Sequence, residues 1–403
     1  MTMFRKTPPH TLFFLIMAIV YVLPTLLTLF FNVNGHLPYV INQFSEFENT
    51  RWALLIIYII VVLSFVLGSS LVTSIFRRSS DTLISYIGPN KSHISFLSKT
   101  QKIVVYAFII LGVFSIYKMR DKGFFSVGDY MESFDIAKTE RNLFAILCDI
   151  YAFLFIFISF NSYRQHKVLR YIILGLVGVT LLAGSRMYIV PLIFYYLYIN
   201  VYVTPFSRKQ LYKLGLFSII ILAGFIFIFT FRHDSSIDSA DTLVLLTQYE
   251  SIGVHIPLMK AINMGWHIQF KPDFVFLFSD IFLFIIPRIV FPLKNLYLFF
   301  DNQVITYALS PFGGVNGIAS VIVYFGVLFP LPFFILGAGL SFLYNLCKRQ
   351  YNNVGLNAYY VYLCSAFMFS FMRNGILIGL KNAIIIALLS VLIVKAQFIT
   401  ANR

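Results

Sequence analysis

Charged residues are scarce in this sequence, and acidic residues are the scarcest. Only 12% of the 403 residues are Asp, Glu, Lys or Arg, with 16 acidic against 31 basic residues, whereas 59% are hydrophobic. Soluble globular domains carry about twice that share of charge. The composition therefore excludes a water-soluble globule and predicts an all-α polytopic membrane protein, with residues 1–403 forming a single membrane domain.

Cysteines and familiar catalytic motifs are also missing. Cys148, Cys347 and Cys364 lie in or beside apolar segments without paired spacing, so neither a disulfide framework nor a thiolate metal site is indicated. The chain has no Gly-rich phosphate loop, no HExxH zinc motif and no acidic DxD pair. These absences argue against nucleotide-sugar and metal-dependent chemistry. We therefore expect neither a metal nor another cofactor.

Apolar runs of membrane-crossing length recur along the chain. A bilayer core of ~30 Å needs about 20 helical residues. The runs predicted to span are 11–31, 52–76, 103–117, 143–160, 171–184, 187–203, 214–231, 317–345, 356–372 and 374–394. These ten spans leave residues 232–316 as one large periplasmic loop. Within it, the short apolar run 274–286 is predicted to be a re-entrant or interfacial segment.

Basic residues are divided unequally between the predicted loops. With the N-terminus inside, the cytoplasmic loops collect lysine and arginine and carry almost no acid, as cytoplasmic loops usually do. We therefore expect both termini to lie in the cytoplasm. The basic charge indicates orientation and contact with membrane lipids, not binding of nucleic acid.

Arg186 interrupts a long apolar stretch. It is the only charged residue between Tyr171 and Val203. Two crossings within this stretch leave about 16 residues per helix, or ~24 Å, which is shorter than the hydrocarbon core. The turn at 184–186 should then lie below the outer surface, where an arginine costs at least ~2.5 kcal/mol unless it is paired or hydrated. An anionic ligand is the functional interpretation, and snorkelling to the outer headgroups is the structural one.

More basic and titratable residues are predicted on the same outer face. The full set is Arg186, Arg232, His233, Asp234, His255, Arg288 and Arg373. A guanidinium binds phosphate through two parallel hydrogen bonds and keeps its charge, so several outer arginines favour a lipid pyrophosphate as substrate. As a general base, His233 and His255 rank first because histidine titrates nearest to neutrality. The alternative for either histidine is a role only as a hydrogen-bonding residue of the loop.

Four segments resemble one known family. LLAGSRMYIVPLI, FRHDS, PRIVFP and SPFGGVNGIASVIVYFGVLFP resemble segments of the Wzy-type O-antigen or oligosaccharide repeat-unit polymerases of bacterial envelopes. The resemblance implies a protein of the bacterial inner membrane that transfers a growing glycan from undecaprenyl pyrophosphate to a new repeat unit, itself linked to undecaprenyl pyrophosphate. The transfer is expected at the periplasmic face and without a metal. A chain-length regulator is the further partner that the resemblance suggests.

The resemblance also implies roles for the outer residues. The arginines of the family's outer loops would correspond to Arg186, Arg232, Arg288 and Arg373. We expect Arg186 and Arg232 to be catalytic together with His233 and His255. The remaining outer residues are expected to bind substrate, and these are Arg288, Arg373 and Asp234.

Three other classes of protein remain open. An O-antigen ligase would share the donor, the arginines and the topology, and would differ only in its acceptor. A flippase for lipid-linked oligosaccharides would be expected to show internal repeats and several charges within the spans, but no clear repeat is found. A membrane acyltransferase would carry histidine and arginine in the early helices, and the first two spans have neither.

Two ionisable residues are predicted within spans. Asp149 and Lys381 lie about six and seven residues from the outer ends of their helices, so both should sit ~9 to 11 Å below the same surface. Equal depth predicts an ion pair between the two helices. The alternative is that Lys381 snorkels outward or joins the pyrophosphate site, while Asp149 is protonated or bonded to a hydroxyl.

Overall fold

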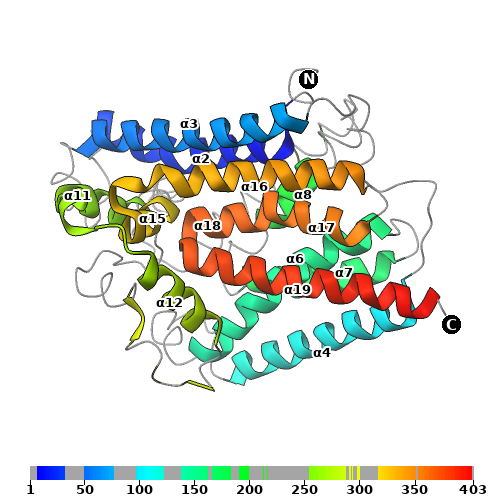
Figure 1. The fold of residues 1–403 in the computed structure, drawn as a ribbon. Coiled ribbons are helices and arrows are strands. Elements are labelled where there is room, and N and C mark those ends of the chain that lie inside the picture. The colour runs from blue at the N-terminus through cyan, green and yellow to red at the C-terminus, as the bar shows by residue number, and fades with distance from the viewer. Residues whose placement is uncertain are drawn as a thin grey trace.

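The computed structural model describes a large part of the chain. It covers residues 7–31, 50–76, 97–121, 138–161, 166–182, 190–198, 254–286, 316–350 and 353–401, together with 212, 216, 290, 291, 293 and 297–299. Every element within these ranges is a helix (Figure 1). The prediction of an all-α membrane protein is confirmed at this level.

The helices are given in chain order. They are α2 (Pro9–Phe31), α3 (Arg51–Phe76), α4 (Lys99–Asp121), α6 (Lys138–Asn161), α7 (Lys167–Leu182), α8 (Val190–Tyr198), α11 (Trp266–Gln269), α12 (Phe274–Ile285), α15 (Gly317–Phe325), the 3-10 helix η5 (Gly326–Leu328), α16 (Pro330–Arg349), α17 (Val354–Tyr362), the π-helix η6 (Leu363–Phe367), α18 (Met368–Asn374) and α19 (Ile376–Ala401). Residues 254–263 are also helical.

Six helical segments of the described chain are long and apolar enough to cross a membrane. They are α2, α3, α4, α16, the continuous α17–η6–α18 and α19. Of the other expected spans, α6 has a shorter apolar core, α7 and α8 are short helices, and the run 214–231 falls outside the described residues apart from residue 216. The apolar run 274–286 forms α12, whose 12 residues extend only ~18 Å and cannot cross a bilayer.

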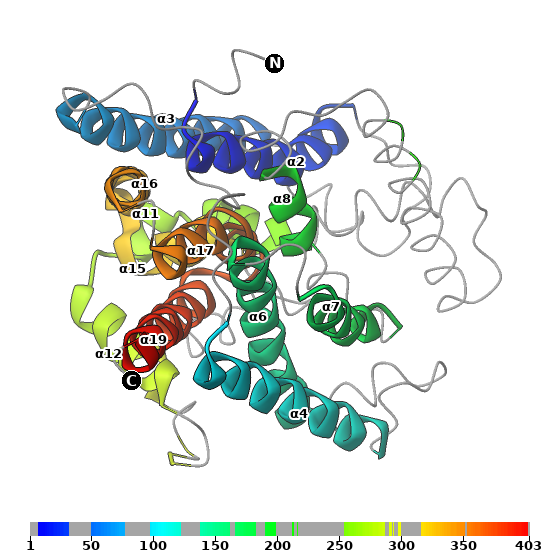
Figure 2. The same ribbon diagram turned by 90° about the vertical axis from the view of Figure 1, so that its right-hand side faces the viewer.

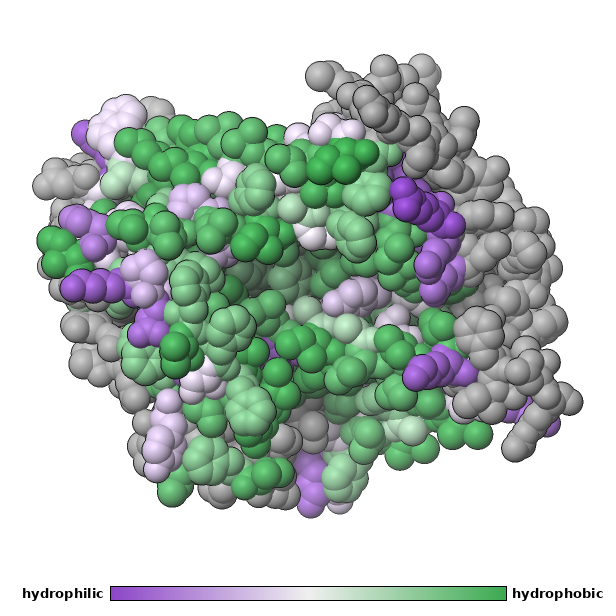
Figure 3. All heavy atoms as spheres, viewed as in Figure 1, coloured by the Kyte–Doolittle hydropathy of each residue, from purple (hydrophilic) through white to green (hydrophobic). Residues whose placement is uncertain are grey.

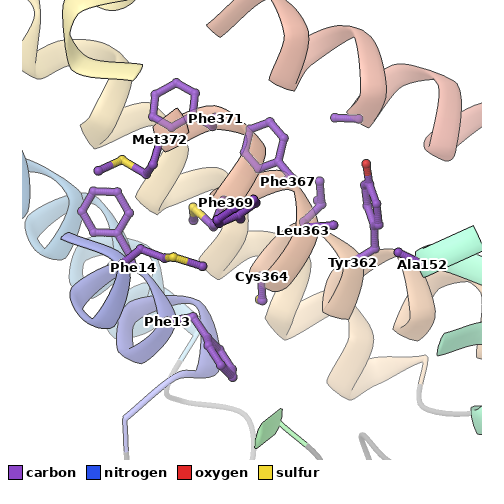
Figure 4. Packing of buried hydrophobic residues seen from close by; sticks show 14 of the residues in the cluster. Phe13, Phe14, Ala152, Tyr362, Leu363, Cys364, Phe367, Phe369, Phe371 and Met372 are labelled. Atoms are coloured by element: carbon purple, nitrogen blue, oxygen red, sulfur yellow. The ribbon is translucent and has the colours of Figure 1, made fainter. Parts of the chain in front are cut away.

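The rod α17–η6–α18 lies at the centre of the bundle. Buried residues make up 83% of its apolar window, against 22 to 50% in the other five candidate spans. It contacts α2, α6, α16 and α19, and the end-on view shows these helices around it (Figure 2). Aromatic rings fill the contacts: Phe371 meets Phe333 of α16 with 5.8 Å between ring centroids, and Phe369 lies 6.2 Å from Tyr21 of α2. Figure 4 shows Phe369 and Phe371 of the rod among the buried hydrophobic residues.

The outward faces of the long helices are apolar. On α3, the exposed side chains Ile56, Ile59, Leu63 and Leu67 recur at every third or fourth residue and so form one stripe. The surface shows hydrophobic residues over most of its middle, with hydrophilic ones mainly near the two ends (Figure 3). Such a surface suits contact with lipid. The end that carries α11, α12 and α15 is named the outer end, because the sequence predicts that it faces the periplasm.

Helices α3 and α16 touch through their backbones. A methyl group on Gly68 would lie 2.1 Å from the Phe334 carbonyl oxygen, and one on Gly337 would lie 2.1 Å from the Phe65 carbonyl oxygen. Small residues at such contacts let membrane helices approach closely, where packing drives association. The two glycines therefore set the distance between these helices.

The predicted continuous span 317–345 is wrong, because the chain breaks at Gly326. This glycine has φ 51°, and a methyl group there would lie 2.0 Å from the Phe270 carbonyl oxygen. Pro330 then starts α16 at a position where its missing N–H costs nothing. Because of this break, α15 is a separate short helix at the outer end. Hydropathy alone does not reveal it.

Substitution of the contact glycines should destabilise the bundle. We expect Gly68→Ala and Gly337→Ala each to lower stability by about 1–3 kcal/mol, because the added methyl forces two backbones apart. Gly339→Ala is the matched control, since a methyl group there meets no atom within 4 Å and alanine favours the helix. Thermal unfolding of the detergent-solubilised protein measures the difference. Equal unfolding midpoints for all three variants would contradict the packing account.

Candidate functional site

Two of the residues predicted to form the outer site lie in the described part of the chain. They are His255, in the helical stretch 254–263, and Arg373, in α18. The others lie outside the described residues: Arg186, Arg232, His233, Asp234 and Arg288. The helices α7 and α8 end and begin at Leu182 and Val190, on either side of Arg186 in the sequence.

Arg373 lies in the last turn of the central rod, at the outer end. Its side chain is half-buried, and Nη1 donates to Asn374 Oδ1 at 3.3 Å. A cation in the last turn is favoured by the helix dipole. Gly375 follows with φ 87°, a conformation that glycine adopts without strain, and turns the chain into α19. The guanidinium is thus held at the outer end of the most buried helix, at the turn into α19.

The start of α15 is seated against the same turn. A methyl group on Gly317 would lie 2.5 Å from the Phe371 carbonyl oxygen, so the two backbones are in contact. Ser320 Oγ donates to the Gly317 carbonyl at 2.7 Å and accepts from the Ile376 N–H at 2.9 Å. The bond to Ile376 fixes α15 to α19, and the close approach of Gly317 seats it against α18.

His255 is fully buried and belongs to a chain of hydrogen bonds. Its Nδ1 lies 3.1 Å from Thr25 Oγ1, and its Nε2 lies 2.6 Å from the Tyr58 hydroxyl. Asn316 Nδ2 donates to the same hydroxyl at 3.1 Å, and Asn316 Oδ1 accepts from the Ile318 N–H at 2.7 Å. One assignment of protons satisfies all of these bonds: Tyr58 donates to Nε2, and the neutral imidazole donates from Nδ1 to Thr25.

This chain of bonds connects four segments that are distant in sequence. Thr25 comes from α2, Tyr58 from α3, His255 from 254–263, and Asn316 caps α15. The sequence analysis identified the histidine but not its partners, because Thr25 and Tyr58 lie in apolar spans and give no local signal. The arrangement positions α15, and the role of His255 as a base stays a prediction.

Asp280 forms a second link at the outer end that the sequence analysis missed. It is the one ionisable residue of α12 and is fully buried. Tyr324 of α15 donates its hydroxyl to Oδ2 at 2.6 Å, and the Phe299 N–H donates to Oδ1 at 2.8 Å. A carboxylate inside an apolar run was itself the available signal, because such a residue needs a partner.

Residues 316–330, the described part of the segment with most of the family resemblance, position the short outer helix. Asn316 caps α15 and bonds to Tyr58, while Tyr324 bonds to Asp280. Gly326 allows the break against the Phe270 carbonyl. The motif therefore builds the short outer helix that lies beside Arg373.

Asp149 connects α6 to α19. Its Oδ2 accepts a hydrogen bond from Asn382 Nδ2. Lys381, the preceding residue, acts electrostatically on the same carboxylate, and its ammonium lies 5.0 Å from the ring centroid of Phe284 in α12. The two helices thus meet at the predicted carboxylate, where an amide provides a hydrogen bond and the lysine adds its charge.

The remaining candidate groups form no metal cluster within the described ranges. No three His, Cys, Asp or Glu residues gather there in an arrangement that holds a metal ion. Cys148, Cys347 and Cys364 are buried and free, and each packs within the core.

Removal of the His255 imidazole should loosen the outer end. His255→Ala leaves the buried Tyr58 and Thr25 hydroxyls without this partner, and each buried unpaired polar group costs about 1–3 kcal/mol. The thermal unfolding midpoint should therefore fall clearly. His267→Ala is the control, because His267 is exposed in α11. If both variants unfold at the temperature of the unsubstituted protein, His255 is not a structural link.

Comparison with known proteins adds no relative. No protein-family model, no curated protein and no solved structure matches the chain. The functional assignment therefore depends on the residues of this chain and on their placement.

Proposed function

We propose that this protein is a membrane glycosyltransferase that polymerises the lipid-linked repeat units of a bacterial surface polysaccharide. The growing glycan leaves undecaprenyl pyrophosphate and joins a new repeat unit that is carried on another undecaprenyl pyrophosphate. The reaction takes place at the periplasmic face of the inner membrane and needs no metal.

The observation that carries this proposal is the position of Arg373 beside the short outer helices. Its half-buried guanidinium lies at the end of the central rod, and α15, which cannot cross the membrane, is bonded to the same turn. The neighbouring α12 exposes Phe278 and Phe282 at 69% and 67%. A basic group beside apolar helices suits a ligand with an anionic head and a lipid tail.

The proposed step is a displacement at the anomeric carbon of the donor glycan. The acceptor hydroxyl oxygen forms the new C–O bond while the bond to the pyrophosphate oxygen breaks, and the electron pair leaves with the pyrophosphate. Guanidinium groups stabilise this growing negative charge. Arg186 and Arg232 are proposed to act on the leaving group, and Arg288 and Arg373 to hold the bound lipid pyrophosphate.

A base must take the proton of the acceptor hydroxyl. Both ring nitrogens of His255 are within hydrogen-bonding distance of Tyr58 and Thr25, and its side chain is fully buried. A base needs to reach the proton that it removes. For this role we therefore rank His233, with Asp234 beside it in the sequence, ahead of His255, which positions α15.

The surface-polysaccharide ladder of a strain that lacks the gene tests the proposal. If the protein is a polymerase, the strain that lacks its gene should show core that carries a single repeat unit. Polymer held on the lipid carrier with no repeats on core would indicate a ligase instead, and accumulation of lipid-linked units at the inner leaflet would indicate a flippase.

Arg373 variants test the site within the same strain. Arg373→Ala should reduce polymer by tenfold or more, and Arg373→Lys should reduce it less, because an ammonium keeps the charge but not the planar fork. Arg349→Ala is the control: Arg349 lies at the opposite end of the bundle, with its guanidinium 5.1 Å from the Phe76 ring centroid. A full ladder with Arg373→Ala at normal protein abundance would remove Arg373 from the site.

Cysteine labelling tests the proposed orientation. Lys271 and Gln350 are exposed at opposite ends of the bundle, and the three native cysteines are buried. A membrane-impermeant maleimide should label the Lys271→Cys variant in intact spheroplasts, and should label the Gln350→Cys variant only after permeabilisation. The reverse pattern would place Arg373 in the cytoplasm.

A further inference from the structure

Lys381 lies at the contact between α12 and α19. It follows Ile376, the first residue of α19, by five positions, so it sits ~7.5 Å along the helix from the outer end. Its side chain is half-buried, and its ammonium is 5.0 Å from the ring centroid of Phe284 in α12. The lysine therefore marks a seam between a spanning helix and a helix that does not span.

The outward side of this seam is apolar, as a surface in contact with lipid would be. Helix α12 packs along α19 at the outside of the bundle, and both ribbon views show the two helices next to each other (Figures 1 and 2). The exposed face of α12 is aromatic, with Phe278 and Phe282 largely open. A lipid that moves within the bilayer can follow this face to Lys381 without passing through water.

Two neighbours make a cation at this depth tolerable. The Phe284 ring offers its negative face to the ammonium. Asp149 of α6 interacts electrostatically with Lys381, and Asn382 donates a hydrogen bond to its carboxyl group. The ammonium thus has an aromatic ring on the α12 side and a carboxyl group on the α6 side.

The sequence connects this seam to the proposed site. Phe284 precedes Arg288 by four residues, and Arg288 is proposed to bind the pyrophosphate. An ammonium is a point charge with three donors, so it attracts phosphate oxygens over many orientations, whereas a guanidinium fork requires one. Contact with an ammonium therefore suits a pyrophosphate that is still moving toward its final position.

We infer that Lys381 binds the pyrophosphate of the lipid-linked donor as the carrier passes between α12 and α19. The inference rests on the proposed function, and adds to it the passage by which the lipid reaches the arginines. The phosphate oxygens share the ammonium with the Asp149 carboxylate. Binding is non-covalent, and no proton is transferred.

The rival explanation is a purely structural ion pair between Lys381 and Asp149. In that case Lys381→Met should lower the thermal unfolding midpoint, and the double variant Asp149→Asn with Lys381→Met should recover part of the loss. For a binding residue, Lys381→Met should weaken binding while the unfolding midpoint stays close to that of the unsubstituted protein.

The experiment measures equilibrium binding of radiolabelled undecaprenyl pyrophosphate to the full chain in nanodiscs. We expect Lys381→Met to raise Kd by about tenfold or more and Lys381→Arg to raise it less than about threefold, because arginine keeps the charge. Lys395→Met is the matched control, since Lys395 is exposed on the same helix near its other end. Undecaprenol, which lacks the pyrophosphate, should bind with the same Kd to the unsubstituted protein and to each variant.

Two outcomes overturn the inference. One is an unchanged Kd for Lys381→Met. The other is a loss of binding that accompanies a lower unfolding midpoint and is restored with it by the double variant. The inference and the proposed function can fail separately. If the protein binds the lipid through Lys381 but makes no polymer, the inference holds and the polymerase is disproved. If it makes polymer but Lys381→Met leaves Kd unchanged, the polymerase holds and the inference is disproved.

Discussion

Hydrocarbon offers no hydrogen-bond partners, so polar side chains buried in a membrane bundle must satisfy one another. In this protein several of them do so across helices that are far apart in the sequence. His10 of α2 lies 2.9 Å from the Tyr360 hydroxyl of α17 and 2.8 Å from Ser69 Oγ of α3 at the end of the bundle opposite the outer one. At the outer end, His255 and Asn316 meet at the Tyr58 hydroxyl. These links fix the helices where apolar packing alone leaves their register free.

The outer end depends most on such links, because its helices are short. Helices α12 and α15 have 12 and 9 residues, and neither is anchored by crossing the membrane. Asp280 and Tyr324 bond them to each other, and Asn316 and Ser320 bond α15 to the bundle. Arg373 consequently stands in a defined place beside apolar helices. A transferase for lipid-linked glycans needs such a place, because the charged head and the lipid tail of its substrate enter different environments.

The sequence predicted the features that follow from hydropathy and length. It identified the membrane class, the long apolar helices and the short segment that became α12. It did not predict the break at Gly326, because that break follows from the close approach of the Phe270 carbonyl, which no local pattern records. The burial of His255 was missed for a similar reason, since its partners lie in spans of ordinary composition. Of the site predicted from the sequence, the structure describes His255 and Arg373, and the placement of the others remains a prediction.

Reconstitution of the purified protein tests the central claim most directly. The substrate is a repeat unit linked to undecaprenyl pyrophosphate, supplied in proteoliposomes with a metal chelator, and the measurement is the free undecaprenyl pyrophosphate released for each new glycosidic bond. The proposal predicts glycans of increasing length and one carrier released per bond, and the chelator should not change this. Repeat units that cross the membrane without being joined, or that stay unchanged, would contradict it.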